Sequence, residues 1–393
     1  MKVLQVNTVY PNGSTGKIAR GIKDMCEQEK IECKVAYRYC EGKEKIEDTY
    51  TVSSFLDCHI HNRLSQRTML QGCFSRLKTY FFLKKVDKFA PDIIHLHNIH
   101  GSFINHKMLF KYIKKNHIKV IWTLHDCWSF TGHCPYFDMI GCEKWKDECG
   151  NCSQKGGSYI DASSKMQKNK KEWFTGVENM TLVTPSNWLA DLVKQSFLKD
   201  YSVKVINNGI DLSIFKPTDS NFREKYNIQD KFILLGVAFG WGKRKGLDVF
   251  IELSKRLDKT FQIVLVGTDE RVDKLLPKNI ISIHRTQNQT ELAQIYSASD
   301  LFVNPTREEN FPTVNIEALA CGTPIVTFKT GGSPEIIDKN CGRVVEKNDL
   351  EGMIRAISEI KEQKPYSEEA CLKRARNFDM SVKFAEYIDL YKE

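Results

Sequence analysis

Short apolar runs alternate with amphipathic stretches along most of the chain. Apolar runs rich in β-branched and aromatic residues are typical of strands buried on both faces, as in parallel sheets. In the first half they predict strands at 2–7, 33–37, 92–97, 119–124, 181–184 and 203–211. In the second half they predict strands at 232–238, 261–267, 300–303 and 324–328. Helical stretches between them, such as 18–29, 188–196, 247–257 and 291–300, make this an α/β pattern.

The stretch 304–322 is the most informative one in the chain. The strand predicted at 300–303 ends where this stretch begins. A short helix is predicted over 314–320, because Gly322 ends it and a proline follows. Pro312 suits the first turn of that helix, where a missing N–H group costs nothing.

The start of this short helix is expected to bind an anion. The N–H groups of Thr313, Val314 and Asn315 would face the carboxyl end of a parallel sheet, where open α/β folds bind anions. Two carboxylates, Glu309 and Glu317, bracket the turn and suit the binding of hydroxyl groups. A helix start of this kind predicts a nucleotide-sugar site. The alternative is two solvated acids that interact favourably with the helix dipole.

The E-x7-E pair lies within E-E-N-F-P-T-V-N-I-E-A-L-A-C-G-T-P-I-V, which resembles the signature of retaining glycosyltransferases of family 4. That family has the GT-B fold, in which two Rossmann-like parallel-sheet domains face a cleft. The resemblance implies that Glu317 binds ribose hydroxyls and that Glu309 lies against the donor sugar. It also implies that Asn310, Thr313 and Val314 belong to the donor site.

A second motif resembles the family's crossover between its two domains. It is N-N-G-I-D at 207–211, followed by F-x-P. We therefore expect an acceptor domain over 1–210 and a donor domain over 211–375. The predicted helix in 376–393 would return to the first domain, as the last helix does in GT-B folds.

Two glycine-rich loops follow predicted strands. The first contains Gly13 and Gly16, but Pro11 and Ile18 break the G-x4-G-K-[ST] pattern, so we reject an ATPase site. The family resemblance implies that both glycines approach the donor sugar and its phosphates. A simple tight turn is the alternative.

The second glycine-rich loop, 239–246, is strongly basic and opens a helix. Backbone amides and cationic side chains in such a loop can hold a diphosphate. The resemblance gives this role to Lys245. Where the family commonly has an arginine this chain has Gly240, so Arg244 or Lys243 is expected to supply the second cation. A solvated basic turn is the alternative.

Several histidines lie at the carboxyl ends of two predicted strands. His125 begins an H-D pair after the strand at 119–124, and the resemblance implies that it lies close to the reacting centre of the donor sugar. The alternative is a histidine satisfied within the core. His95, His97 and His100 surround the end of the preceding strand, and we predict no role for any one of them.

Five of the 13 cysteines lie in the segment 127–152, an insertion outside the general family pattern. Four thiolates with a C-x2-C knuckle suit a structural zinc ion that holds a long loop, with His133 as an alternative ligand. Reduced thiols and disulfides are the other interpretations. The predicted ligands are Cys134, Cys142, Cys149 and Cys152.

Composition indicates a globular protein, with 41% apolar and 27% charged residues among 393. No apolar run approaches the roughly 20 residues that span a bilayer, and the start does not resemble a signal peptide, so we expect a cytoplasmic protein. A net charge of +9 fits anionic substrates or an anionic membrane, and equally a lysine-rich proteome. No recognition motif accompanies the lysines, so nucleic-acid binding is not expected.

Two stretches of the chain are strongly basic. The stretch 63–89 mixes arginines and lysines with aromatic residues, so it suits either the inner face of an anionic membrane or a packed helix with solvated lysines. The run 165–171 is predicted to be a solvated helix face.

Together these features predict a retaining glycosyltransferase that uses a UDP- or GDP-sugar. It would transfer a hexose-type sugar to a saccharide or lipid-linked saccharide in bacterial surface polysaccharide synthesis. Lys245 and a nearby arginine would stabilise the departing diphosphate, and Glu309 and His125 would orient the sugar, so no catalytic cofactor is expected. The alternatives are a nucleotide-sugar epimerase or hydrolase of the same fold, and a non-catalytic saccharide- or nucleotide-binding protein.

Overall fold

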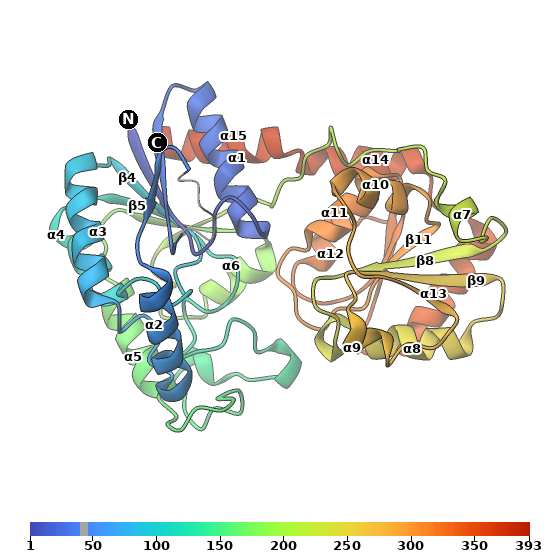
Figure 1. The fold of residues 1–393 in the computed structure, drawn as a ribbon, viewed down its shortest axis with the longest axis horizontal. Coiled ribbons are helices and arrows are strands. Elements are labelled where there is room, and N and C mark those ends of the chain that lie inside the picture. Colours follow the sequence, from blue (N-terminus) through green and yellow to red (C-terminus); the bar gives the residue numbers. More distant parts are fainter. Residues whose placement is uncertain (40–45) are drawn as a thin grey trace. The chain divides into compact units, whose positions relative to one another are not determined.

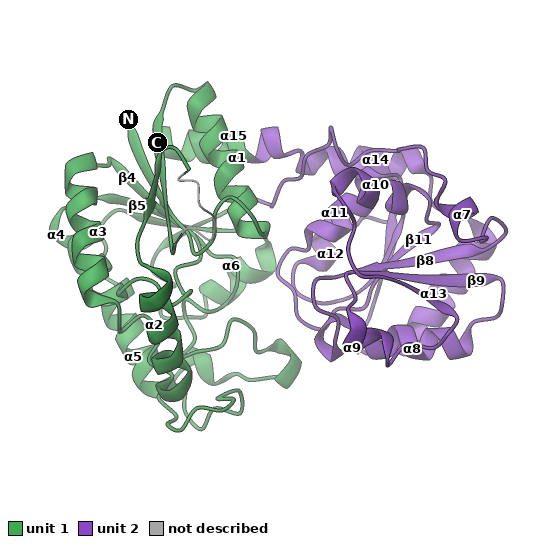
Figure 2. Ribbon diagram, in the orientation of Figure 1, with its two compact units in different colours: residues 1–206, 384–393 green, residues 207–383 purple. Residues whose placement is uncertain are grey.

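The computed structural model describes residues 1–39 and 46–393, which form two compact units (Figure 2). Unit 1 comprises Met1–Ile206 together with Phe384–Glu393, and unit 2 comprises Asn207–Lys383. Each unit contains one parallel sheet with helices packed against it (Figure 1). The predicted α/β fold with two Rossmann-like domains is confirmed.

The sheet of unit 1 has seven strands in the order β3-β2-β1-β4-β5-β6-β7. Val3 in the central strand lies opposite Cys33 on one side and Ile93 on the other. The order reverses between β1 and β4, and open α/β sheets bind ligands at the carboxyl ends of strands beside such a reversal. The strands are β1 (Lys2–Val6), β2 (Glu32–Tyr37), β3 (Thr49–Thr51), β4 (Ile93–Leu96), β5 (Lys119–Thr123), β6 (Met180–Thr184) and β7 (Ser202–Val205).

The sheet of unit 2 has six strands in the order β10-β9-β8-β11-β12-β13, with the reversal between β8 and β11. The strands are β8 (Phe232–Val237), β9 (Phe261–Val266), β10 (Ile280–Ile283), β11 (Leu301–Asn304), β12 (Ile325–Phe328) and β13 (Gly342–Val345). Every strand predicted above is present, and the prediction missed β3, β10 and β13. These three are short and lie at sheet edges, where few apolar residues mark a strand.

The helices of unit 1 differ from prediction in several places. The helix predicted at 18–29 begins at Ser14, and the one predicted at 188–196 ends at Val193. The stretch 63–89 is not one helix, because left-handed backbone at Met69 and Ser75 separates α2 from α3. The helices are α1 (Ser14–Gln28), α2 (Phe55–Thr68), α3 (Arg76–Phe89), α4 (His106–Lys115), α5 (Ser163–Phe174), α6 (Asn187–Val193) and, from Phe384 onward, α15 (Met380–Lys392). The 3₁₀ helices η1 (Asp138–Ile140) and η2 (Lys144–Lys146) lie in the cysteine-rich insertion.

The helices of unit 2 are mostly short. They are α7 (Phe222–Lys225), α8 (Leu247–Arg256), α9 (Glu270–Asp273), α10 (Gln289–Ser297), α11 (Thr313–Ala320), α12 (Ser333–Ile336), α13 (Leu350–Gln363) and α14 (Glu368–Ala375), with 3₁₀ helices η3 (Lys243–Lys245) and η4 (Arg376–Phe378). Among the described residues, no helix is both long and apolar enough to cross a membrane.

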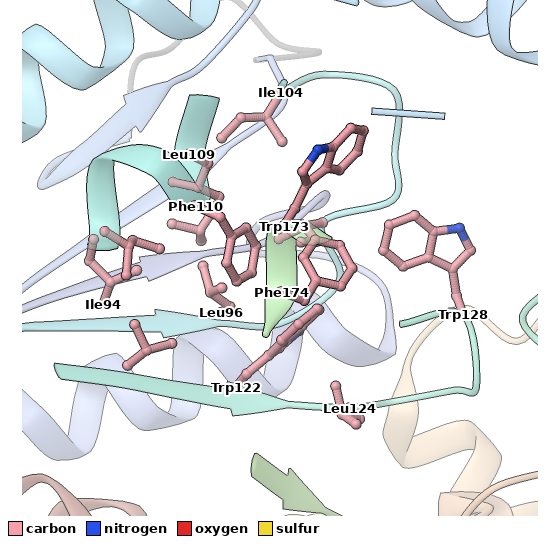
Figure 3. Close-up of a cluster of buried hydrophobic side chains, with 14 of the residues drawn as sticks. Ile94, Leu96, Ile104, Leu109, Phe110, Trp122, Leu124, Trp128, Trp173 and Phe174 are labelled. Carbon is pink, nitrogen blue, oxygen red and sulfur yellow. The ribbon is translucent and has the colours of Figure 1, made fainter. Parts of the chain in front are cut away.

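Aromatic side chains dominate the core of unit 1 (Figure 3). The rings of Phe110 and Phe174 lie 4.5 Å apart, and Trp122 of β5 packs against both of them at 5.6 and 5.0 Å. Trp128 extends this cluster, with its ring centroid 6.2 Å from that of Phe174. Because buried aromatic rings contribute large apolar areas, this packing anchors the loop that follows β5.

The end of α15 packs into unit 1. Tyr387 and Tyr391 are buried, and the Tyr391 hydroxyl lies 2.6 Å from Nδ1 of His95 in β4. Lys119 at the start of β5 donates to the carbonyl oxygen of Leu390 at 3.0 Å. These contacts fix the terminal helix to the two strands whose carboxyl ends carry the histidines.

Candidate active site

In unit 2, two loops meet at the point where the strand order reverses. The loop after β8 holds η3 and ends at Gly246, whose φ of 77° is left-handed. A Cβ atom on Gly246 would lie 2.5 Å from the carbonyl oxygen of Pro305 in the loop after β11. A glycine is therefore needed here for both the backbone conformation and the close approach of the two loops.

Arg307, in the loop after β11, holds the basic loop in place. Its guanidinium makes two hydrogen bonds to the Asp248 carboxylate, at 2.7 and 2.9 Å, and donates to the Lys243 carbonyl oxygen at 2.5 Å. A further bond of 2.6 Å joins its Nε to Asn348. Arg307 is only 9% exposed, whereas 47% of the Asp248 side chain is exposed, so the clamp is buried on its Arg307 side. Arg307 lies inside the stretch 304–322, but no motif in the sequence indicated its role.

Lys245 and Glu309 form an ion pair at the junction of the same two loops. Both side chains are largely buried, with 18% and 16% of their surface exposed. The other carboxylate oxygen of Glu309 accepts the Asn310 N–H at 3.3 Å. The loop after β12 supports this turn, since Gly332 donates its N–H to the Asn310 carbonyl at 2.7 Å. Three predicted site residues are therefore neighbours.

Arg244 lies in the same basic loop as Lys245. One guanidinium nitrogen is 3.4 Å from the Glu308 carbonyl oxygen, a long hydrogen bond. The Arg244 carbonyl accepts the Arg307 N–H at 2.8 Å, which joins the two loops through the backbone. The structure thus places both predicted cations, Arg244 and Lys245, beside the turn that contains Glu309.

Helix α11 begins at Thr313, one residue earlier than predicted, with Pro312 as its N-terminal flanking residue. One expectation is wrong: the Asn315 N–H does not face a ligand, because it donates to the Pro312 carbonyl at 3.1 Å. Asn315 instead uses its side chain, which accepts from Asn304 and donates to Ser333, both at 2.8 Å. This buried network fixes the start of α11 to the carboxyl end of β11.

Glu317, in α11, accepts a hydrogen bond of 3.1 Å from the Tyr296 hydroxyl. Tyr296 is fully buried, and burial together with the Glu317 charge raises the pKa of its hydroxyl well above the usual value. The tyrosine therefore remains a hydrogen-bond donor near neutral pH and orients the carboxylate. No motif in the sequence indicated this role for Tyr296, which occupies an apolar position of the helix predicted at 291–300.

In unit 1, the loop after β1 ends at Gly13, and Gly16 lies in the first turn of α1. Gly13 has a left-handed φ of 77°, and a Cβ on Gly16 would lie 3.2 Å from the Pro11 backbone. The buried side chain of Asn7 donates to the Val9 carbonyl at 2.9 Å and so braces the turn. Gly13 and Gly16 therefore lie at the carboxyl end of the strand beside the reversal of this sheet.

The histidines of unit 1 form hydrogen-bonded pairs at the ends of β4 and β5. His97 and His125 approach to 3.2 Å between ring nitrogens, and burial lowers the pKa of His125 to about 4. His100 lies 3.0 Å from the Asp126 carboxylate. Burial alone would raise the pKa of Asp126, but His100 and the Trp128 N–H hold it below its usual value. Near neutral pH the site therefore contains a neutral His125 beside an ionised Asp126.

Both halves of the chain match the sequence patterns of sugar-transferring enzymes. The pattern described as Glycosyltransferase Family 4 matches residues 27–214, and the pattern described as Glycosyl transferases group 1 matches residues 218–378. The chain is a GT-B glycosyltransferase.

A relative that is similar over most of its length is also named as a glycosyl transferase. The glycosyltransferase is 22% identical over 376 residues to WcaC of Escherichia coli (strain K12), named as a colanic acid biosynthesis glycosyl transferase. That alignment covers 89% of this chain and 88% of the relative.

Two solved structures share the fold. Sucrose-phosphate synthase from Thermosynechococcus elongatus superposes with a TM-score of 0.74 at 16% identity, covering 100% of this chain and 98% of that one. Anabaena HepE in complex with UDP-glucose superposes with a TM-score of 0.69 at 14% identity, covering 100% and 99%. At such low identity these likenesses establish the fold alone.

One prediction about the glycosyltransferase's basic run 165–171 is wrong, because Lys170 is fully buried. Its ammonium donates to the carbonyl oxygens of Trp128 and Thr131 at 2.6 and 2.9 Å, and lies 3.5 Å from the centre of the Trp128 ring. Lys170 therefore supports the loop that begins with His125. Its burial was not visible in the sequence because its neighbours in α5 include exposed lysines.

The cysteine-rich insertion surrounds a cavity of about 310 Å³ that all four predicted zinc ligands line. Across residues 1–39 and 46–393, however, no three His, Cys, Asp or Glu side chains come together as metal ligands would. Burial raises the pKa of Cys134 to about 12, and the Cys149 sulfur accepts the Gly132 N–H at 3.3 Å. None of the described cysteines forms a disulfide, but the four predicted ligands do not come together as a metal-binding group, so this arrangement does not support the predicted zinc site.

Proposed function

We propose that this glycosyltransferase moves a sugar from a nucleoside diphosphate sugar to a saccharide or lipid-linked saccharide, with retention of the anomeric configuration. The observation that carries the proposal is the Lys245–Glu309 ion pair, where the two loops meet in unit 2. An ammonium group and a carboxylate at one point suit a ligand that offers phosphate oxygens and sugar hydroxyls together.

In this proposal unit 2 binds the donor. Lys245 and Arg244 neutralise the diphosphate, and the N–H groups of Thr313 and Val314 contribute the positive end of α11. The same cations stabilise the charge that develops on the leaving diphosphate, which is electrostatic catalysis by fixed groups. No catalytic metal or other cofactor is required for this step.

The remaining donor contacts involve carboxylates and backbone. Glu317, oriented by Tyr296, binds the ribose hydroxyls, while Glu309 and Asn310 contact the sugar. We propose that His125 in unit 1 contacts a sugar hydroxyl, and that Gly13 and Gly16 allow a ligand to approach the backbone closely. The acceptor binds mainly to unit 1.

The comparisons support a role in bacterial surface polysaccharide synthesis. WcaC carries the name of colanic acid biosynthesis, and the HepE structure contains UDP-glucose, which makes a UDP-sugar the first donor to test. A GDP-sugar is the second donor to test, because the proposed contacts are with the phosphates and the ribose and do not distinguish one base from another.

Ligand-dependent thermal stability tests the donor site. Purified protein, Glu317→Ala and the surface control Glu362→Ala would each be heated with UDP, GDP, ADP or CMP. A ligand at about 100 times its dissociation constant stabilises a protein by roughly 2.7 kcal/mol. We expect one nucleoside diphosphate to raise the Tm of the wild type and the control, but not that of Glu317→Ala. A wild type that responds to none of the four would contradict the proposal.

Turnover distinguishes the alternatives. A transferase releases nucleoside diphosphate rapidly only when an acceptor is present, whereas an epimerase or hydrolase consumes the donor alone. A non-catalytic binding protein would keep its nucleotide affinity in Lys245→Ala and would turn over no acceptor. The Lys245–Glu309 pair favours the transferase, since a binding protein does not require that arrangement.

We also propose that helices α2 and α3 bind an anionic membrane surface at the cytoplasmic face. Leu56, Ile60 and Leu64 follow helical spacing on α2 and are 69%, 52% and 38% exposed. On α3, Leu77 and Phe81 are 67% and 55% exposed. Arginines and lysines occur on the same helices, and this combination is typical of helices that lie in a lipid interface.

A further inference from the structure

A chain of hydrogen bonds joins Gln5 in β1 to His125 after β5. Gln5 Oε1 lies 3.0 Å from His97 Nε2, and His97 Nδ1 lies 3.2 Å from His125 Nε2. Gln5 is 0% exposed and His97 is 1% exposed, so these polar atoms have to satisfy one another. Such a chain determines which ring nitrogens carry hydrogens.

The Gln5 amide has one possible orientation. Its Nε2 donates to the Ala19 carbonyl at 3.0 Å and to the Cys33 sulfur at 3.4 Å. A flipped amide would place Oε1 against the Ala19 carbonyl, leaving two buried acceptors in contact without a hydrogen between them. Gln5 therefore presents its oxygen to His97, and His97 has to donate from Nε2.

The direction of this first bond determines the second. Burial lowers the pKa of His97 well below its usual value, and the neighbouring His95 and His125 lower it further. With both His97 and His125 neutral near pH 7, each ring has one N–H group and one acceptor nitrogen. His97 uses its hydrogen at Nε2, so its Nδ1 accepts, and His125 donates from Nε2.

The neighbouring His95 does not compete for these atoms. Its ring lies 4.0 Å from that of His97, but its nitrogens contact Tyr391 at 2.6 Å and Thr123 at 2.8 Å. Both nitrogens of His97 are taken by Gln5 and His125, and the Trp122 indole donates to the His97 carbonyl at 3.1 Å. His97 is therefore held in position by its backbone as well as its ring.

We propose that Gln5 and His97 are positioning residues that fix His125 as the tautomer protonated on Nε2. The Nδ1 atom of His125 is then a hydrogen-bond acceptor, which suits a sugar hydroxyl that donates its hydrogen. The tautomer follows from the hydrogen bonds between Gln5, His97 and His125 with both rings neutral, whereas the contact with sugar rests on the proposed function. This assignment gives His97 a role for which the sequence offered no interpretation.

Nitrogen NMR measures the tautomer directly. Protein labelled with ¹⁵N in its histidine rings would be compared with His125→Gln, which identifies the signals of His125. We expect a hydrogen on Nε2 and none on Nδ1. In His97→Leu and in Gln5→Met the preference should weaken toward a mixture of tautomers. In His97→Asn it should persist, because the amide oxygen replaces Nδ1 as acceptor.

Kinetics test the catalytic part of the inference. The loss of one neutral hydrogen bond costs about 1.4 kcal/mol of transition-state stabilisation. We therefore expect kcat/KM of His97→Leu to be roughly tenfold lower than that of the wild type. The kcat/KM of His97→Asn should lie within about threefold of the wild-type value. The kcat/KM of the exposed control His117→Leu should equal that of the wild type.

The outcomes separate the two proposals. A wild-type His125 with its hydrogen on Nδ1, or a tautomer that does not change in His97→Leu, would overturn the inference. If the tautomer of His125 changes in His97→Leu but kcat/KM does not, the claim that His97 assists turnover would be overturned. If the wild type transfers no sugar at all, the proposed function fails, while the NMR result still decides the tautomer.

Discussion

The Lys245 ammonium and the Glu309 carboxylate are each other's partner, and both are largely buried. A diphosphate that binds Lys245 has to compete with Glu309. Glu309→Gln keeps the shape and removes the competing charge, so we expect UDP or GDP to bind more tightly by about 1 kcal/mol, roughly a fivefold lower Kd. Turnover should fall at least about tenfold, because Glu309 also orients the sugar. Calorimetry measures the change in Kd, and initial rates measure the change in turnover. Weaker nucleotide binding in Glu309→Gln would contradict the proposed competition between Glu309 and the diphosphate.

The bond from Tyr296 to Glu317 predicts a second effect on affinity. Tyr296→Phe removes the hydroxyl and keeps the ring that packs 5.6 Å from Phe302. We expect the Kd of the nucleoside diphosphate to rise roughly threefold to tenfold, since a hydrogen bond to a carboxylate contributes about 1.5 kcal/mol. Tyr226→Phe, another tyrosine of unit 2, is the matched control. An unchanged Kd in Tyr296→Phe would show that the hydrogen bond from Tyr296 to Glu317 does not contribute to nucleotide binding.

The Arg307 clamp predicts a coupled loss of stability and affinity. Arg307→Met breaks two hydrogen bonds to Asp248 and releases the Lys243 carbonyl. We expect stability to fall by about 1–3 kcal/mol and nucleotide affinity to fall as well, because the basic loop loses its anchor.

Arg256→Met is the control for this clamp. Arg256 pairs with Glu351 through two bonds of 2.8 and 3.0 Å, but that pair is exposed, so its loss should cost less than about 1 kcal/mol. Thermal melts with and without nucleotide compare the two variants. Equal effects in Arg307→Met and Arg256→Met would mean that the clamp does not support the site.

The sequence predicted the strands of both sheets because buried parallel strands leave continuous apolar runs. It missed β3 and β10, which consist of T-Y-T and I-I-S-I, since so few residues carry no reliable period. The break between α2 and α3 was also missed, although Gly72, with a left-handed φ of 73°, lies inside it. The left-handed residues Met69 and Ser75 on either side are not of a type that usually marks a break.

The candidate site was predictable where motifs define it. Lys245 and Glu309 lie 64 positions apart, yet each belongs to a motif that resembles the same family, and the structure brings them together. Arg307, Tyr296 and Lys170 belong to no motif. Their roles depend on partners 59, 21 and 42 positions away, which neither composition nor periodicity reveals.

The exposed apolar residues of α2 and α3 predict binding to lipid. Leu56→Ser with Phe81→Ser should lower the partition of the protein onto anionic vesicles at least about tenfold, because each buried apolar side chain contributes roughly 1.5–3 kcal/mol. Co-sedimentation with vesicles that contain phosphatidylglycerol measures this, and vesicles of phosphatidylcholine alone test the electrostatic part. Leu275→Ser, which removes a 63% exposed side chain from unit 2, should have no effect. If the wild-type protein does not bind anionic vesicles, the proposed membrane binding by α2 and α3 is ruled out.

Lys170 predicts how stability depends on pH. Burial lowers the pKa of its ammonium to about 7 from 10.5, and the negative charge of Asp126 limits the fall. Between these two values the unfolded chain binds a proton that the folded protein has lost, so the contribution of Lys170 to stability increases as the pH rises. Relative to Lys170→Met, the wild type should gain roughly 3 kcal/mol between about pH 7 and pH 9.5.

Denaturant melts at several pH values test this difference. Lys168→Met serves as the control, because the Lys168 side chain is 66% exposed and its pair with Glu148 lies at the surface. The wild type and Lys168→Met should show parallel pH profiles, while Lys170→Met should diverge from both as the pH rises. A Lys170→Met profile parallel to that of the wild type would show that Lys170 keeps its proton over this range. Its two bonds to the carbonyls of Trp128 and Thr131 would then be those of a charged ammonium throughout.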